Sequence, residues 1–169
     1  LTKNISIFGK MNSGYRDLDL NGYELYTNEY FSDGLTTING GKLVADKGIT
    51  IGVYGTLVMT NEKDYVKAGD SFIANSEKDH TGCLTAGVLE VKGDFTQNGQ
   101  SSKSFIASGT HTTILSGKQG SMNRDYIQSI NFKNPGDSKF NHLILTKKMT
   151  KYLFSHSVEQ LCNTYENIV

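Results

Sequence analysis

Aspartates recur along this chain at positions where carboxylates could do acid–base chemistry. Asp64, Asp70 and Asp94 all lie near glycine-containing turns. Clustered carboxylates can protonate a leaving oxygen and activate water in polysaccharide cleavage. An aspartate at a turn more commonly accepts hydrogen bonds from its own backbone. We therefore favour a structural role and keep a β-helix polysaccharide lyase or hydrolase, with these acids on its outer face, as the alternative.

Other candidate reactive groups lack the partners that their chemistry needs. His80 and Cys83 have a spacing that can hold a metal, but no second His/Cys pair accompanies them, and His111 or His142 would have to be brought alongside by the fold. Nothing in the sequence around Cys83 indicates a lowered thiol pKa. The segment "SGKQG" (116–120) lacks the upstream glycine of a phosphate-binding loop. We expect no catalytic residue, no metal and no cofactor.

Aromatic and amide side chains provide the best binding signal. Exposed aromatic rings beside amides suit stacking and hydrogen bonding to sugars. This hypothesis assigns ligand binding to Tyr23, Tyr26, Tyr54, Asn61 and Tyr65. The alternative is structural, with about half of the rings packed inside the fold and asparagines satisfying backbone groups in stacked turns.

Charge and composition exclude several classes of partner. Seventeen basic and seventeen acidic residues leave no formal net charge, which argues against nucleic-acid binding. No apolar run approaches the roughly 20 residues of a membrane span, so we expect no membrane insertion of this segment. Two cysteines, Cys83 and Cys162, are too few for a disulfide framework, and two free thiols are the favoured state.

Three segments of the chain repeat one pattern. "LNGYELYTNEYF" (20–31), "INGGKLVADKGI" (38–49) and "LTAGVLEVKGDF" (84–95) begin 18 and 46 residues apart, and half of 46 is 23, the length of one coil. Each has a leucine at its sixth position and an apolar residue at its twelfth. These residues are Leu25, Leu43 and Leu89, and Phe31, Ile49 and Phe95. A second match aligns Gly55-x-Leu57 with Gly82-x-Leu84.

Apolar residues alternate with polar ones within each unit, which indicates strands. In "GVLEVKGDFTQ" (87–97) this places Leu89, Val91 and Phe95 inside, Glu90 and Lys92 outside, and Gly93 at a corner. Because the units repeat head to tail, equivalent strands would stack in parallel. We predict an all-β fold, a single-stranded parallel β-helix (solenoid) with right-handed winding. A β-sandwich is the alternative.

The period changes near the C-terminus. In "SVEQLCNTYENIV" (157–169) the apolar residues fall on one helical face, and Ser157 with Gln160 forms a capping box. We predict a β-solenoid domain over residues 1–149 and a C-terminal cap segment over 150–169 that contains a short helix. A docking helix for another chain is the alternative.

Several segments resemble a known group of proteins. "YGTLVMTNEKDYVKAGDSF" (54–72), "HTGCLTAGVLEVKGDFTQ" (80–97), "FIASGTHTTILSGKQG" (105–120) and "NPGDSKFNHLIL" (134–145) are similar to parts of repeat-rich surface proteins of Gram-positive gut and soil bacteria. Such regions are adhesin-like or haemagglutinin-like β-solenoids. The resemblance implies an extracellular or cell-surface location and a structural or adhesive role.

These observations together predict a noncatalytic surface module. It would be a rigid spacer or an adhesin-like domain for glycans or host proteins, with other domains of a longer surface protein as partners. Because the sequence opens at Leu1, we expect it to be cut from a longer precursor that carries the export signal. A scaffold that self-assembles end to end is a further alternative.

Overall fold

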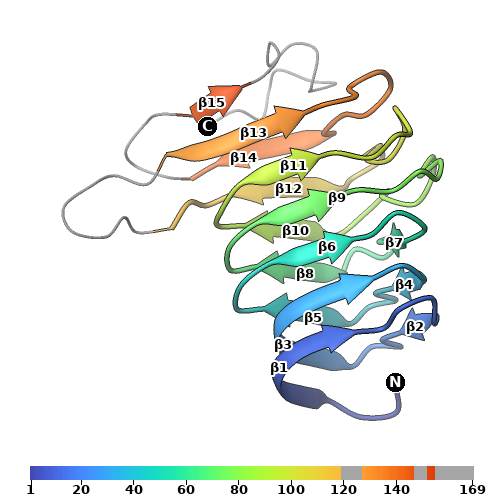
Figure 1. The fold of residues 1–169 in the computed structure, drawn as a ribbon. Coiled ribbons are helices and arrows are strands. Elements are labelled where there is room, and N and C mark those ends of the chain that lie inside the picture. Colours follow the sequence, from blue (N-terminus) through green and yellow to red (C-terminus); the bar gives the residue numbers. More distant parts are fainter. Residues whose placement is uncertain (119–126, 147–151, 155–169) are drawn as a thin grey trace.

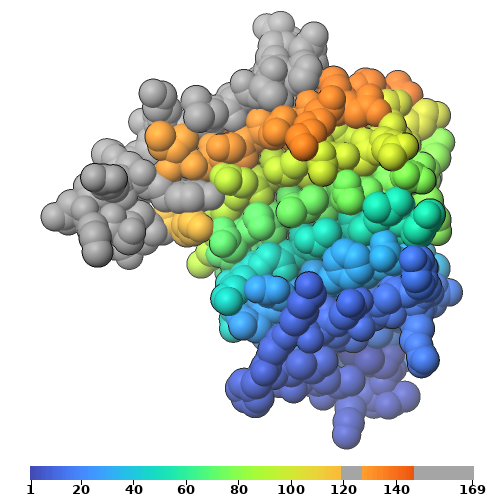
Figure 2. Space-filling view, viewed as in Figure 1, coloured from blue at the N-terminus to red at the C-terminus, as the bar shows by residue number. Residues whose placement is uncertain are grey.

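The computed structural model describes residues 1–118, 127–146 and 152–154, and all regular structure in them is strand. The chain passes through successive repeats, shown as stacked bands in Figure 2. The strands are β1 (Ile5–Asn12), β2 (Leu18–Asp19), β3 (Glu24–Ser32), β4 (Leu35–Thr37), β5 (Lys42–Ala45), β6 (Ile49–Ile51), β7 (Thr56–Val58), β8 (Tyr65–Ala68), β9 (Phe72–Ala74), β10 (Val88–Val91), β11 (Phe95–Gln97), β12 (Thr112–Leu115), β13 (Gln128–Phe132), β14 (His142–Leu145) and β15 (Tyr152–Phe154).

A curled parallel sheet dominates the molecule (Figure 1). Its 12 strands run in the order β14-β12-β10-β8-β5-β3-β6-β9-β11-β13-β15, with β1 also paired to β3. A 3-stranded sheet, β2-β4-β7, is likewise parallel. The predictions of an all-β chain and of parallel neighbouring strands are confirmed for the described residues, and the curled sheet is compatible with a β-helix.

The strand register aligns the leucines that the repeat analysis singled out. Leu25 pairs with Leu43, Leu43 with Val66, and Val66 with Leu89. Val66 lies midway between Leu43 and Leu89, so the predicted spacing of 23 residues is observed between these neighbouring strands. All four side chains are buried.

Two details of the sequence alignment are wrong. Tyr30, and not Phe31, pairs with Ile49, because the turn between β5 and β6 contains one more residue than the equivalent part of β3. Leu84 forms a β-bridge with Met59 and not with Leu57, because the chain from the end of β9 (Ala74) to Leu84 is two residues longer than the chain from the end of β6 (Ile51) to Met59. An offset of one residue reverses the face on which a side chain lies, so Tyr30 is buried and Phe31 is partly exposed.

The core lies inside the curl and changes character along the chain. Aliphatic side chains fill the first repeats, whereas a phenylalanine cluster fills the later ones. Phe95 is central to this cluster, with ring centroids 4.8 Å from those of Phe105 and Phe140. Leu89, Val91 and Phe95 are fully buried, as predicted. Burying each such side chain contributes about 1.5–3 kcal/mol.

Turns between strands depend on residues that tolerate unusual backbone or close approach. Asn21 and Asn39 have positive φ, 50° and 49°, as asparagine tolerates. A Cβ atom on Gly93 would lie only 2.7 Å from the carbonyl oxygen of Asp70 in the neighbouring repeat. The corner role predicted for Gly93 is therefore explained by close packing between repeats.

The C-terminal segment begins differently from the prediction. Tyr152–Phe154, within the expected helical cap of 150–169, form β15 and pair in parallel with β13. Parallel pairing supplies these residues with backbone partners from a neighbouring strand, so this part is strand and not helix. The helix expected from Ser157 lies outside the described residues. No helix in the described part of the chain could cross a membrane.

Candidate functional site

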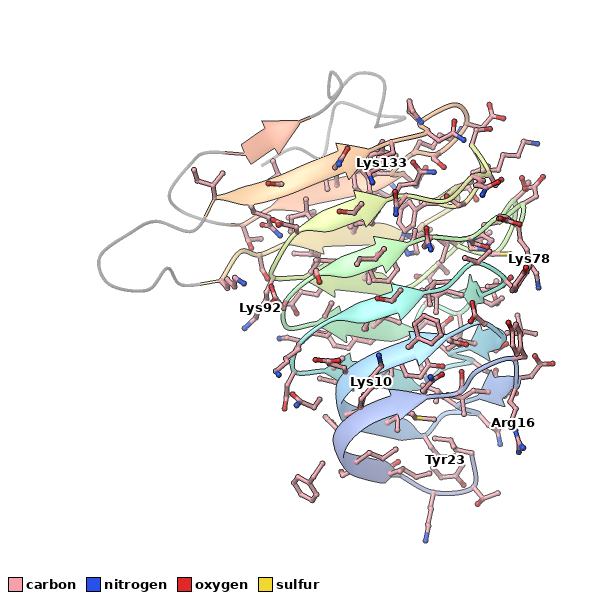
Figure 3. The ribbon with its side chains drawn as sticks, in the orientation of Figure 1. Lys10, Arg16, Tyr23, Lys78, Lys92 and Lys133 are labelled. Carbon is pink, nitrogen blue, oxygen red and sulfur yellow. The ribbon has the colours of Figure 1, made fainter. Side chains whose placement is uncertain are left out.

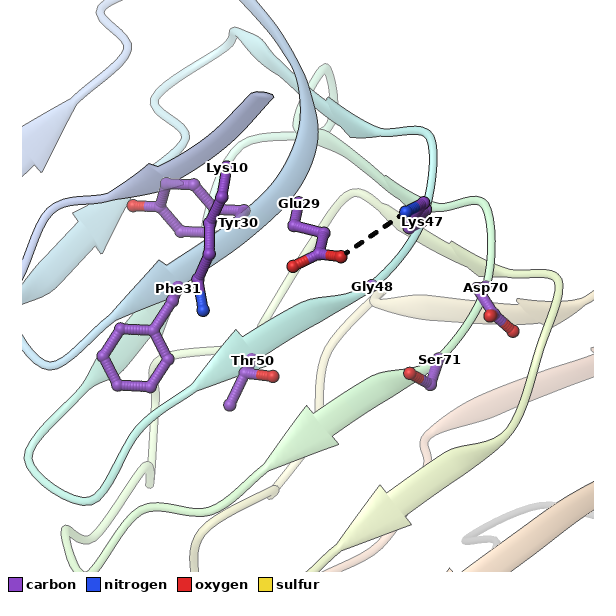
Figure 4. Close-up of a pocket in the computed structure, with 9 residues that line it drawn as sticks. All are labelled: Lys10, Glu29, Tyr30, Phe31, Lys47, Gly48, Thr50, Asp70 and Ser71. Atoms are coloured by element: carbon purple, nitrogen blue, oxygen red, sulfur yellow. Dashed lines mark ion pairs between the residues drawn. The ribbon is translucent and has the colours of Figure 1, made fainter. Parts of the chain in front are cut away.

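A hollow of about 270 Å³ opens on the outer surface beside β3, at the turns that precede β6 and β9 (Figure 4). Strand alternation directs Phe31 and Thr50 outward, and these two residues pair across β3 and β6. Lys10 of β1 and Ser71, before β9, lie at the two ends of the hollow. Gly48 is part of the lining, and a Cβ there would lie 3.2 Å from the Ser71 hydroxyl oxygen. Its missing side chain helps to keep the hollow open.

The charges of the hollow are partly paired. Lys47 Nζ lies 3.8 Å from Glu29 Oε1, and Lys118 Nζ lies 2.7 Å from Asp70 Oδ1. Lys10 instead lies over the Phe31 ring, with Nζ 5.6 Å from the centroid, and forms no ion pair with a described carboxylate. The hollow thus offers an ammonium group, two hydroxyl groups and part of an aromatic ring to a ligand.

A polar network covers the outer face of β3, β5, β8 and β10. The Tyr26 hydroxyl donates to Glu24 Oε2 at 2.7 Å, and Lys42 pairs with Glu24 at 3.0 Å. The Tyr26 hydrogen bond and then Lys42 hold the pKa of Glu24 below its ordinary value. The Lys42 ammonium also lies 6.0 Å from the centroid of Tyr65, so the network extends to the next repeat.

Glu90 ends this network. It accepts hydrogen bonds from Tyr65 at 2.5 Å and Ser116 at 3.0 Å, and it pairs with Lys67 at 3.2 Å. Burial opposes ionisation of Glu90, but these three partners hold its pKa below the ordinary value. Burial and the bond to Glu90 raise the pKa of Tyr65. The Tyr26 and Tyr65 hydroxyls are thus already engaged by carboxylates.

The five residues predicted to bind ligand do not form one groove. Tyr26 and Tyr65 share the network described above. Tyr23 precedes β3 and is partly buried (Figure 3). Asn61 lies in the turn before β8, where its side-chain oxygen accepts a hydrogen bond from the Lys63 backbone. Tyr54 precedes β7, where it contacts Tyr15 instead of another predicted residue.

Tyr15 and Tyr54 form an exposed aromatic pair. Their side chains are 73% and 49% exposed, and their ring centroids lie 5.9 Å apart with planes tilted by 40°. Asp33 belongs to the repeat between them. Its backbone N–H donates to the Gly14 carbonyl at 2.8 Å, and its Oδ1 accepts from the Tyr54 N–H at 3.3 Å.

The three acids considered for catalysis have separate structural partners. Asp64 is buried and accepts backbone hydrogen bonds from Gly40 at 2.5 Å, Thr60 at 2.8 Å and Asn61 at 3.0 Å. Asp94 accepts from the Ser129 backbone at 2.8 Å, and Asp70 pairs with Lys118. Asp64 and Asp70 lie at opposite ends of β8. The turn interpretation explains the contacts of Asp64 with Thr60 and Asn61, whereas Asp70 and Asp94 contact residues far away in the sequence. The structure does not bring the three carboxylates together.

His80 and Cys83, the pair considered for metal binding, are both at least partly buried. Burial lowers the pKa of His80, whose Nε2 lies 3.2 Å from the Gly55 carbonyl oxygen. Burial raises the pKa of the Cys83 thiol, which is unpaired; Cys162 lies outside the described residues. Among the described residues, no group of three or more His, Cys, Asp and Glu side chains could hold a metal ion.

Sequence reasoning did not identify the hollow or the role of Tyr15. Lys10, Lys47 and Ser71 come from different repeats. They lie close together only because the strands of these repeats are paired in a particular register. The alternation of inward and outward side chains could have predicted that Phe31 and Thr50 face outward together. The sequence alignment instead placed Phe31 inside, one residue out of register, and this concealed the hollow. Comparisons with protein-family models, curated proteins and solved structures find no match to this chain.

Proposed function

We propose that this chain is a noncatalytic module of a bacterial cell-surface protein, a right-handed β-solenoid that acts as a rigid spacer or an adhesin-like domain. The observation that carries this proposal is the uninterrupted inner column from Leu25 through Leu43 and Val66 to Leu89, in parallel register. Such a column joins each repeat to the next by hydrogen bonds and buried contacts. Right-handed winding is the rule for parallel crossovers.

The outer surface supports a binding role more than a catalytic one. The carboxylates of Asp64, Asp70 and Asp94 are each held by backbone N–H groups or by a lysine. By contrast, Lys10 in the hollow forms no ion pair with a described carboxylate, and the Tyr15 and Tyr54 rings are exposed. Cell-surface location, neighbouring domains of a longer protein, and glycans or host proteins as ligands are parts of this proposal that rest on the resemblance described above.

Rigidity can be tested with two spin labels. We would label Ser6→Cys and Lys133→Cys, two positions near opposite ends of the described repeats, in a chain that carries Cys83→Ser and Cys162→Ser. A rigid module predicts one narrow distance distribution that is insensitive to salt. A Ser6→Cys/Lys10→Cys pair, both on β1, serves as the matched control for label flexibility. A distribution much broader than that of the control would contradict the spacer role.

Catalysis is tested separately. The unmodified chain and the Asp64→Asn, Asp70→Asn and Asp94→Asn variants are incubated with a panel of polysaccharides, and new reducing ends and unsaturated products are measured. We expect no release by any of them. Depolymerisation that is lost in these variants would overturn the noncatalytic assignment in favour of the lyase or hydrolase.

A further inference from the structure

Exposed apolar side chains concentrate at one corner of the molecule. Six large apolar residues in the described part are exposed, and three of them, Tyr15, Leu35 and Tyr54, come from three successive repeats. Leu35 pairs with Thr56, two residues after Tyr54. Leu18, three residues after Tyr15, pairs with Thr36. These residues therefore lie where the chain enters β2, β4 and β7, and we call them the Tyr15–Tyr54 corner.

The backbone of this corner is fixed by the repeats on either side. Asp17 Oδ1 accepts from the Leu35 N–H at 3.1 Å, and Asp33 Oδ1 accepts from the Tyr54 N–H at 3.3 Å. The Gly34 Cα lies against the Arg16 backbone so closely that a side chain would clash. The rings are thus presented by an ordered backbone, and little ordering entropy would be lost on binding.

Polar residues that suit hydroxyl ligands belong to the same corner: Arg16 and Asp17 follow Tyr15 in the sequence, and Asp33 contacts the Tyr54 backbone. Asp17 and Asp33 each use Oδ1 for a backbone contact, while their Oδ2 atoms accept no hydrogen bond from a described residue. Arg16 is exposed (Figure 3). Aromatic faces and carboxylates both repel an anionic ligand. They suit a ligand that combines apolar C–H faces with hydroxyl donors.

We propose that the Tyr15–Tyr54 corner binds an uncharged saccharide chain. Its C–H faces would pack on Tyr15, Leu35 and Tyr54, and its hydroxyls would donate to Asp17 and Asp33 and accept from Arg16. This inference extends the adhesin-like part of the proposed function by naming a site and a ligand class. The hollow near Lys10 and Gly48 is a separate feature and takes no part in it.

Binding is measured on the whole chain by saturation-transfer difference NMR and titration. The probes are neutral hexasaccharides of glucose, mannose, galactose and xylose, with hexagalacturonate as the acidic counterpart and an alkylammonium salt as the cationic one. We expect at least one neutral oligomer to bind, with transfer to its ring C–H protons. Tyr15→Ala and Tyr54→Ala should each weaken binding roughly five-fold or more, and Tyr15→Phe and Tyr54→Phe much less.

The matched control is Phe8→Ala, which removes an exposed aromatic ring on β1, outside the Tyr15–Tyr54 corner, and should leave binding unchanged. The inference is overturned if no neutral oligomer binds, if the Tyr15 and Tyr54 variants bind as the unmodified chain does, or if hexagalacturonate or the alkylammonium probe is preferred. A narrow spin-label distance distribution together with no saccharide binding would refute the saccharide inference and leave the spacer role standing. A broad distribution would refute the spacer role whatever the saccharide result.

Discussion

At the scale of single residues, buried polar side chains determine how the molecule responds to pH. His111 is fully buried, and neither ring nitrogen has a hydrogen-bond partner among the described residues. Burial, and then the neighbouring His142, lower its pKa to about 4. A histidine with this environment stays neutral in the folded chain.

We expect stability to fall as the pH is lowered from about 6.5 to about 4. In this window the unfolded chain binds a proton at His111 that the folded chain does not, so the free energy of unfolding decreases, by up to about 3 kcal/mol. Burial lowers the pKa of His80 as well, which adds a loss in the same direction. Urea unfolding at a series of pH values measures the slope.

The variant His111→Leu isolates this contribution. It should remove most of the slope, leave the part due to His80, and preserve stability at neutral pH because no polar group is then buried without a partner. An unchanged slope in His111→Leu would refute the assignment.

Sequence reasoning was most accurate for residues whose position depends only on local alternation. Leu89, Val91 and Phe95 are buried as predicted, and Asp64 accepts hydrogen bonds from the backbone of its own turn. The tyrosines were harder to place, because hydrophobicity and polarity do not decide on which face an amphipathic ring lies. Tyr30 turned inward and Tyr54 outward, and only the register distinguishes them.

At the scale of elements, close packing at the turns holds adjacent repeats together. A methyl group at Gly93 would meet the Asp70 carbonyl, which is backbone and cannot rotate away. We predict that Gly93→Ala destabilises the chain by about 1–3 kcal/mol, measured by urea denaturation. Gly9→Ala is the matched control, because a Cβ there has no atom within 4 Å. Equal midpoints for the two variants would show that the β8–β9 and β10–β11 turns have room to separate.

Turn lengths explain why the elements were predicted better than their alignment. Glycines and alternating apolar residues locate strands well, but one extra residue between β5 and β6, and two more before Leu84, shift the register. Nothing local in the sequence specifies such insertions. Likewise, the amphipathic pattern of the C-terminal segment did not reveal that Tyr152–Phe154 pair with β13, because strand pairing depends on a distant neighbour.

At the scale of the whole molecule, interior strands are stabilised by a strand on each side, whereas terminal strands have a single neighbour. Among the described strands, β8 pairs with β5 and β10, whereas β1 pairs with β3 alone. We therefore predict that amides of Tyr65–Ala68 exchange with solvent at least about tenfold more slowly than those of Ile5–Asn12, since terminal strands open at lower free energy. Hydrogen-exchange mass spectrometry of peptides from both segments measures this. Equal rates would indicate that the sheet opens only as a whole.

The register of the inner column also constrains how such a chain can change during evolution. Equivalent residues are 18 apart between Leu25 and Leu43 but 24 apart between Leu89 and Thr113, although both pairs lie on adjacent strands. The connecting segments thus accommodate different lengths, at a cost that grows slowly with loop length, while the advance per repeat remains the distance between neighbouring strands. Longer connecting segments can therefore add surface at the sides of the stack without changing its length along the stacking axis.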